Sequence, residues 1–316
     1  MYYGCSWIKM LALKINTRID TNEECIALCC EPVEKQPAVG FGSTAKETVG
    51  NFIKMHQEVV VESKKYANCG ENVKRLYTDG CVKCGNYKLG EWDGDGLIHY
   101  VNLSMYPASC QCKCIYCDVH SSDKGRLNKA SSEEYYQKMF DMLNYACEIG
   151  LIAEDALWQI SSGEITIHPY KDRIYDLVEN RRAIFFTNCF IFDERIAEIL
   201  SLNPYSSINF SIDAGTPQTW FKIKGVDNFE LVTDNLVNYY SASIRPDQIT
   251  LKYIVLPGIN DTLRDYQSLI EMMKILKINR LSISRDYSCK YSNDSEKFSH
   301  LCVAASYLLA LLKKNG

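Results

Sequence analysis

Long apolar runs are absent from this 316-residue sequence, and so is a strong excess of charge of either sign. No apolar stretch reaches the roughly 18–20 residues that a membrane-spanning helix needs, which argues against an integral membrane protein. The first residues lack the basic and apolar segments of a secretory signal, so we expect a cytoplasmic protein. The 35 Lys and Arg against 39 Asp and Glu argue against a basic surface spread over the whole protein, and nucleic acid is not an expected partner.

Cysteine, in contrast, is abundant, with 15 residues in the chain. A chain of this length can bury a core without disulfides, and thiols stay reduced in the cytosol. An excess of cysteine therefore indicates metal or redox chemistry. The cysteines gather in the first 85 residues and between residues 110 and 117, and few follow.

Apolar runs of strand length alternate with segments of helical periodicity after residue 96. Strands are predicted at 98–105, 156–161, 183–187, 207–213, 249–256 and 280–284. Helices are predicted at 131–149, 170–180, 193–200, 228–240, 262–276 and 295–313, with Ser132 and Asp261 as helix starts. This alternation predicts parallel βα units, which place functional groups at the carboxyl ends of the strands. We therefore expect two domains, a cysteine-rich module at 1–95 and an α/β domain with a C-terminal helix at 96–316.

The densest group of cysteines follows the first predicted strand. Cys110, Cys114 and Cys117 have the spacing CxxxCxxC, and Tyr116 precedes the third cysteine. Three thiolates on a short loop can hold three irons of a 4Fe–4S cluster and leave one iron open. Because Cys112 lies between them, a four-cysteine zinc site is the alternative, although such sites usually pair two separated CxxC hooks. No second hook follows in the sequence.

This motif, its position after a strand and the βα repeat that follows resemble the radical S-adenosylmethionine (radical SAM) superfamily over about residues 96–290. The resemblance implies a partial (β/α)6 TIM-like barrel. It also implies a 4Fe–4S cluster on Cys110, Cys114 and Cys117, with S-adenosylmethionine (SAM) bound at the open iron. An electron from a low-potential donor such as flavodoxin or ferredoxin would cleave SAM to a 5′-deoxyadenosyl radical, which abstracts hydrogen from a substrate.

The family's Gly-Gly-Glu motif has a counterpart after the second predicted strand, in Ser162, Gly163 and Glu164. Ser162 replaces the first glycine. The resemblance implies that these residues and Tyr116 bind SAM. A simpler interpretation of Glu164 is an acidic residue at a helix N-terminus.

Polar residues on two later strands extend the expected SAM site. Ser211 and Asp213 alternate with apolar residues, so we expect them to share one face of a strand. The resemblance implies contacts with the ribose and methionine parts of SAM. Lys252 is a candidate partner for the methionine carboxylate. The simpler alternatives are a turn-capping Asp213 and an exposed strand lysine.

Cys289 follows the last predicted strand and is the candidate catalytic residue. A thiol there would return a hydrogen atom to a substrate radical, as in radical epimerases. A bystander cysteine is the alternative.

The N-terminal cysteines resemble the auxiliary-cluster modules called SPASM and twitch, although those modules usually follow the barrel. The resemblance implies a second, auxiliary 4Fe–4S cluster on Cys5, Cys30, Cys81 and Cys84, with Cys29 as the alternative to Cys30. A structural zinc site is the other interpretation of the same residues.

The resemblance therefore implies a radical SAM enzyme that modifies a peptide or protein by oxidation, crosslinking or epimerisation. Peptide and protein modification is the commonest association of SPASM-like modules. Radical oxidation or rearrangement of a sugar or small metabolite is one alternative, because no winged-helix domain for peptide recognition is recognisable. A zinc-binding adaptor without catalysis is the other.

Overall fold

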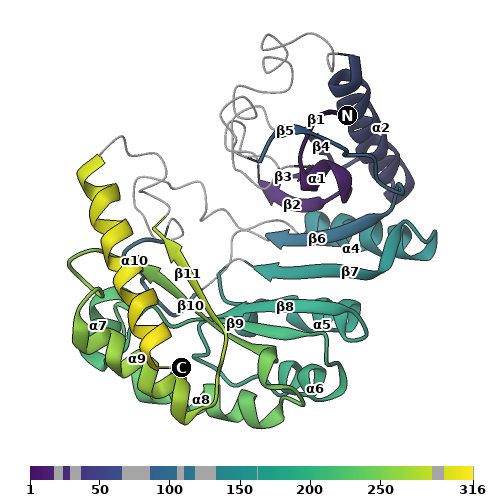
Figure 1. Ribbon diagram of the computed structural model, residues 1–316. Coiled ribbons are helices and arrows are strands. Elements are labelled where there is room, and N and C mark those ends of the chain that lie inside the picture. The colour runs from purple at the N-terminus through teal and green to yellow at the C-terminus, as the bar shows by residue number, and fades with distance from the viewer. Residues whose placement is uncertain are drawn as a thin grey trace. The chain divides into compact units, whose positions relative to one another are not determined.

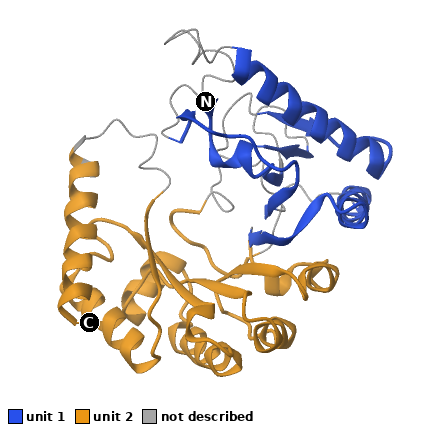
Figure 2. Ribbon diagram, turned by 45° about the vertical axis from the view of Figure 1, so that its right-hand side comes forward, with its two compact units in different colours: residues 1–107, 128–162 blue, residues 108–127, 163–316 orange. Residues whose placement is uncertain are grey.

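The computed structural model describes residues 1–17, 24–28, 37–65, 86–104, 110–117, 133–161, 163–286 and 295–315. The chain divides into two compact units (Figure 2). Unit 1 comprises residues 1–107 and 128–162, and unit 2 comprises residues 108–127 and 163–316. Each unit contains its own set of paired strands.

Unit 1 holds a set of five strands, hydrogen-bonded in the order β7-β6-β2-β3-β4. Their bounds are β2 (Leu13–Thr17), β3 (Glu24–Ala27), β4 (Ala38–Gly40), β6 (Ile98–Ser104) and β7 (Ile152–Ser161). β6 pairs in parallel with β7 and with β2, whereas β3 runs antiparallel to β2 and β4. The N-terminal strands therefore extend the sheet that β6 and β7 begin.

Helices cover these strands in unit 1 (Figure 1). They are α1 (Ser6–Lys9), α2 (Ala45–Lys65) and α4 (Glu133–Glu148). The buried residues of α2 include Val49, Phe52 and Val59, which recur at helical spacing, and α2 packs against α4. A separate antiparallel pair joins β1 (Tyr2–Gly4) to β5 (Lys88–Gly90).

Unit 2 holds four parallel strands, paired in the order β8-β9-β10-β11. They are β8 (Arg182–Thr187), β9 (Ser207–Ser211), β10 (Ile249–Val255) and β11 (Leu281–Arg285). The connecting helices are η3 (Ile165–Ile167), α5 (Lys171–Val178), α6 (Glu194–Leu202), α7 (Pro217–Lys224), α8 (Phe229–Ala242), η4 (Pro246–Gln248) and α9 (Leu263–Ile275), and α10 (Ser295–Asn315) follows the last strand.

The two faces of the unit 2 strands differ in polarity. Ile208 and Phe210 of β9 are fully buried, whereas Asn209 and Ser211, which alternate with them, are only half-buried. Figure 1 shows α5, α6, α8 and α9 on the outer side of these strands. The opposite, polar face is therefore available to a polar ligand.

The α/β class and the six βα strands predicted from the sequence are confirmed, with strand ends shifted by a few residues. No closed barrel is formed by the strands that the structure describes. Helices α2 and α7 were not expected. The predicted helix start at Asp261 is wrong, because Thr262 is the N-cap of α9 and accepts the Asp265 N–H. The domain boundary at 95/96 stays a prediction, and unit 1 also contains β6, α4 and β7.

Within the described ranges, every helix is too short or too polar to span a bilayer.

Candidate functional site

The cysteine loop, residues 110–117, lies in unit 2 and is held by the end of α7. The Lys113 N–H donates to the Lys224 carbonyl at 2.7 Å, and the Ile115 N–H donates to the Ile223 carbonyl at 3.0 Å. These carbonyls belong to the last turn of the helix, where no further helical N–H can reach them. The loop therefore supplies the missing donors.

Gly225 ends α7 and permits this close approach. Its φ of 69° lies in the left-handed region, and a Cβ at this position would lie 3.1 Å from the Lys113 Cβ. Glycine avoids both penalties, so the turn that closes the helix also leaves room for the loop.

The four thiols of the loop differ in burial and in acidity. Cys110, Cys114 and Cys117 are half-buried, whereas Cys112 is only 1% exposed. The pKa of Cys110 is lowered, and the pKa of Cys114 is lowered to about 6. In both cases a side-chain hydrogen bond with Cys112 is the largest cause. Hydrogen bonds with both neighbours, together with burial, raise the pKa of Cys112 itself. Cys112 is therefore the least acidic of these three thiols, and it shares hydrogen bonds with the two more acidic ones.

A buried ion pair lies against this loop. The Lys224 Nζ is 2.6 Å from Asp213 Oδ2 and donates to the Tyr116 hydroxyl at 2.8 Å. Tyr116 in turn donates to Asp213 Oδ2 at 2.5 Å. The side chains of Lys224 and Asp213 are 1% and 0% exposed. The charge of Lys224 further lowers the pKa of Cys114, so the pair contributes to the electrostatics of the loop.

Asp213 does not occupy the strand face predicted for it. β9 ends at Ser211, and Asp213 has a φ of 49°, which turns its side chain toward Lys224. Its second oxygen, Oδ1, accepts the Ile254 N–H at 2.6 Å. The prediction that Ser211 and Asp213 share one face is wrong, because the left-handed turn breaks the alternation. Protein donors hold both oxygens of this carboxylate.

Ser211 and Lys252 lie side by side on the polar face of unit 2. They are register partners in β9 and β10, and Ser282 of β11 is the next partner of Lys252. Burial is the largest cause that lowers the pKa of Lys252, and the charge of Asp213 is the largest influence that raises it, followed by smaller Coulombic effects of Lys224, Cys114 and Cys117. Among the described residues, its ammonium makes no hydrogen bond or ion pair. Lys252 therefore places an unpaired, half-buried cation near the cysteine loop.

Glu164 is buried, and its carboxylate accepts four hydrogen bonds. Its Oε1 accepts the Thr166 N–H at 3.3 Å, the Thr166 hydroxyl at 2.9 Å and the Thr187 hydroxyl at 2.7 Å. Its Oε2 accepts the Asn188 N–H at 2.7 Å. Burial raises the pKa of Glu164. Glu164 caps η3, as its simpler interpretation predicts, and Gly163 before it has a φ of 52°.

Asn188 connects this buried carboxylate to the cysteine loop, and the sequence analysis missed it. Its Nδ2 donates to Cys110 Sγ at 3.5 Å and to Gln111 Oε1 at 3.3 Å. The available signal was a polar residue directly after the predicted strand 183–187, at the edge where parallel strands present functional groups. Lys224 was missed as well, since it ends a helix that was not predicted.

The family model of the radical SAM superfamily matches residues 107–273, which contain the cysteine loop, Glu164, Asn188 and Lys252. The chain belongs to the radical SAM superfamily. No curated protein matches the sequence.

Two solved structures of SuiB share the fold of this chain at low sequence identity. Streptococcus suis SuiB bound to the precursor peptide SuiA is 12% identical with a TM-score of 0.52, over 99% of this chain and 70% of that one. SuiB bound to S-adenosylmethionine is 14% identical with a TM-score of 0.50, over 85% and 56% of the two chains. A radical SAM methyltransferase from Sphaerobacter thermophilus is 14% identical with a TM-score of 0.43, over 66% and 61%. A third structure of Streptococcus suis SuiB is 14% identical with a TM-score of 0.49, over 84% of this chain and 53% of that one. This chain therefore spans only about half of that protein's length.

Membership in the radical SAM superfamily implies a 4Fe–4S cluster and SAM, and the cysteine loop fits this cluster. Among the described residues, no group of three or more His, Cys, Asp or Glu is placed to hold a single metal ion. A 4Fe–4S cluster instead binds each cysteine to a different iron. Three half-buried thiols with hydrogen-bond and cationic partners, beside a fourth that is buried and protonated, match a three-cysteine site.

Several residues expected in radical SAM chemistry lie outside the described residues, namely Ser162, Cys289, Cys30, Cys81 and Cys84. Cys5 is described and stands at the N-terminus of α1 in unit 1, where it is half-buried. The auxiliary cluster and the catalytic role of Cys289 stay predictions.

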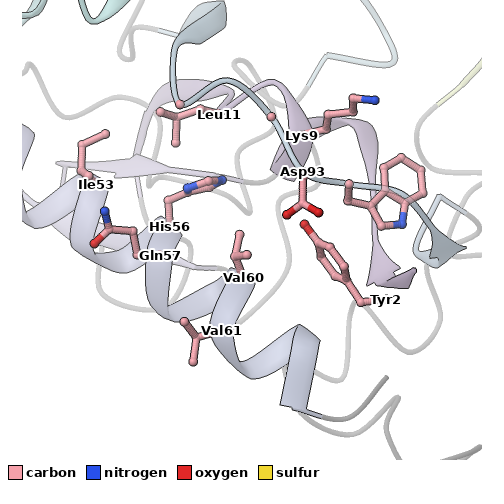
Figure 3. A pocket seen from close by; sticks show the side chains of 12 residues that line it. Tyr2, Lys9, Leu11, Ile53, His56, Gln57, Val60, Val61 and Asp93 are labelled. Atoms are coloured by element: carbon pink, nitrogen blue, oxygen red, sulfur yellow. The ribbon is translucent and has the colours of Figure 1, made fainter. Parts of the chain in front are cut away.

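Unit 1 has a pocket of its own, with a volume of about 290 Å³ (Figure 3). His56 and Val60 of α2 line it together with Tyr2 and Asp93. His56 Nε2 lies 2.8 Å from the Ile8 carbonyl, and burial is the largest cause that lowers the pKa of this histidine. None of the predicted SAM-binding residues lines this pocket.

Proposed function

We propose that this radical SAM protein cleaves SAM reductively and uses the resulting radical to abstract hydrogen from a peptide or protein substrate. The substrate radical would then lead to oxidation, crosslinking or epimerisation of the peptide. The observation that carries the proposal is the cysteine loop, with three half-buried thiols near an unpaired lysine. When bound, the cluster supplies the electron that cleaves SAM to a 5′-deoxyadenosyl radical.

The residues of unit 2 have distinct roles in this proposal. Cys110, Cys114 and Cys117 ligate the cluster, and Cys112 stays protonated between two of them. Lys252 binds the methionine carboxylate of SAM, because an anion there would neutralise a half-buried ammonium that has no partner among the described residues. Ser211, its register neighbour, offers a hydroxyl to the same ligand.

For Glu164 and Asp213 we propose a supporting role in place of the direct contacts with SAM that the sequence predicts. Protein donors already engage the carboxylate oxygens of both residues. We assign Glu164 to the support of the strand end at Asn188, and Asp213 to the support of Lys224 and Tyr116. Gly163 provides the turn before Glu164.

A peptide substrate is supported by the likeness to SuiB, whose structure with the precursor peptide SuiA matches nearly the whole chain. The proposal includes an auxiliary 4Fe–4S cluster on Cys5, Cys30, Cys81 and Cys84. Such a cluster would accept the electron left on the substrate after hydrogen abstraction and deprotonation. Reduction by flavodoxin or ferredoxin completes the proposed cycle.

Iron content and SAM cleavage test the chemistry. The protein is reconstituted anaerobically, and iron is counted in the wild type and in the Cys110/Cys114/Cys117→Ala variant. We expect about eight irons in the wild type and about four in the variant, with 5′-deoxyadenosine formed only by the wild type. Four irons that disappear in the variant would refute the auxiliary cluster alone. Zinc without iron would refute the enzyme.

Lys252→Met tests the SAM site, with Lys274→Met as the matched control because Lys274 is an exposed lysine of α9. We expect weaker SAM binding with unchanged iron in Lys252→Met only. The substrate class is tested with a fully deuterated cell extract, separated into peptide and small-metabolite fractions. Deuterium transferred to 5′-deoxyadenosine from the peptide fraction supports the proposal, and transfer only from small metabolites contradicts it.

A further inference from the structure

The side chain of Asn188 donates a hydrogen bond to Cys110 of the proposed cluster from outside the cysteine loop. It stands directly after β8 and is 7% exposed, so water competes little for its amide. Its Nδ2 lies 3.5 Å from Cys110 Sγ. For a sulfur acceptor, this is hydrogen-bond distance.

The orientation of this amide is determined by its other partners. The Asn188 Oδ1 accepts the Phe190 N–H at 2.9 Å, which requires the oxygen on that side of the group. The backbone N–H of Asn188 donates to the buried Glu164 at 2.7 Å. Both contacts hold the residue so that its NH2 group, and not its oxygen, faces Cys110 and the neighbouring Gln111.

We propose that Asn188 raises the reduction potential of the SAM-binding cluster by donating this hydrogen bond to Cys110, an inference that rests on the proposed function. Reduction adds one electron to the cluster and its thiolates, so the ligand sulfur becomes a stronger acceptor. A donor at Cys110 therefore stabilises the reduced cluster more than the oxidised one. The Glu164 carboxylate acts through Asn188, because it holds the backbone from which the amide projects.

Two substitutions at position 188 remove the hydrogen bond to Cys110 and keep the side-chain acceptor for the Phe190 N–H. In Asn188→Ser, the hydroxyl can still accept the Phe190 N–H, but the serine side chain is too short to reach Cys110. Asn188→Asp keeps the size and the turn, and it replaces the donor by an oxygen with negative charge. Asn203→Ser is the matched control, since Asn203 Oδ1 also accepts the N–H two residues on, at 3.0 Å, while its Nδ2 donates to the Arg181 carbonyl.

The experiment is a potentiometric titration of the reconstituted full chain, followed by electron paramagnetic resonance. The signal of interest is the one that the Cys110/Cys114/Cys117→Ala variant lacks. A hydrogen bond to a charged acceptor is worth roughly 10- to 150-fold in an equilibrium, and only the part that differs between the oxidised and the reduced cluster changes their ratio. We therefore expect the ratio of reduced to oxidised cluster at a fixed potential to fall about tenfold in Asn188→Ser, which is about 59 mV for a one-electron couple.

Asn188→Asp should shift the ratio further in the same direction, because it adds a like charge beside the thiolate. Asn203→Ser should leave it unchanged. An unaltered ratio in Asn188→Ser, at full iron content, overturns the proposal. Loss of iron in Asn188→Ser but not in Asn203→Ser also overturns it, since the contact would then hold the cluster instead of tuning it. A wild type that binds no cluster would refute the proposed function and this inference with it, whereas an unaltered ratio at full iron content refutes the inference alone.

Discussion

Replacing Lys224 by Met tests whether the buried ion pair supports the cysteine loop. The change removes the ammonium that lies 2.6 Å from Asp213 and 2.8 Å from the Tyr116 hydroxyl, and it keeps an apolar stem of similar length. Removal of one partner from a buried pair costs about 3–5 kcal/mol, because the remaining charge stays in a poorly solvated site. Tyr116 and the Ile254 N–H still donate to Asp213, so we expect the lower end, about 3 kcal/mol.

The free energy of unfolding of the full chain, measured in urea, checks this value. Combining Lys224→Met with Asp213→Asn removes both charges, and we expect the double variant to recover at least about 1 kcal/mol relative to Lys224→Met alone. Lys274→Met, an exposed lysine, should change stability by less than about 0.5 kcal/mol. A cost below about 1 kcal/mol for Lys224→Met, or a double variant no more stable than Lys224→Met, would refute the reasoning.

Three further predictions concern acid stability, backbone conformation and iron content. Burial lowers the pKa of His168 from 6.5 to about 4, so between these values the unfolded chain binds a proton here that the folded protein does not. The free energy of unfolding is therefore unaffected by protonation of this histidine above pH 6.5 and falls as the pH drops toward 4. Between pH 7 and pH 4, the wild type should therefore lose about 3 kcal/mol more than His168→Asn in unfolding titrations, and equal losses would contradict this. Gly225→Ala should cost about 1–2 kcal/mol through its left-handed φ and its approach to Lys113, whereas Gly50→Ala, inside α2 with open space around it, should gain about 0.5–1 kcal/mol. Urea titrations that rank these two glycine variants in the opposite order would disprove the role of the turn. Cys112→Ala should retain the iron of the SAM-binding cluster on reconstitution, and a loss equal to that of the triple variant would make Cys112 a ligand.

The strands and most helices of the βα repeat could be predicted because their signal is local. A run such as 183–187 or 249–256 alternates with helical periods and is bounded by turn residues, and no distant contact is needed to recognise it. Helix α2 was missed although Val49, Phe52 and Val59 have helical spacing. It lies in a segment judged by its cysteines, and Gly50 weakens its propensity.

The three candidate ligand cysteines could be singled out from the sequence for the same reason, because their spacing is local. The side chains that surround them could not. Lys224 reaches Tyr116 across 108 positions, and Asn188 reaches Cys110 across 78. The side chain of Asp213 depends on one left-handed residue at a strand end, and alternation cannot reveal such a residue. Contacts of this kind follow from the tertiary fold and have no periodic signature.

The attachment of the cysteine loop to the end of α7 has a consequence for the assembly of the protein. The Lys113 and Ile115 amides donate to helix carbonyls of α7, so we expect this part of the loop to keep its shape in the apoprotein. In the apoprotein, these two amides should exchange with deuterated solvent more slowly than amides of an unstructured segment. Under the proposed function, iron and sulfide would then enter a loop whose backbone is already arranged, and cluster insertion would lose little conformational entropy.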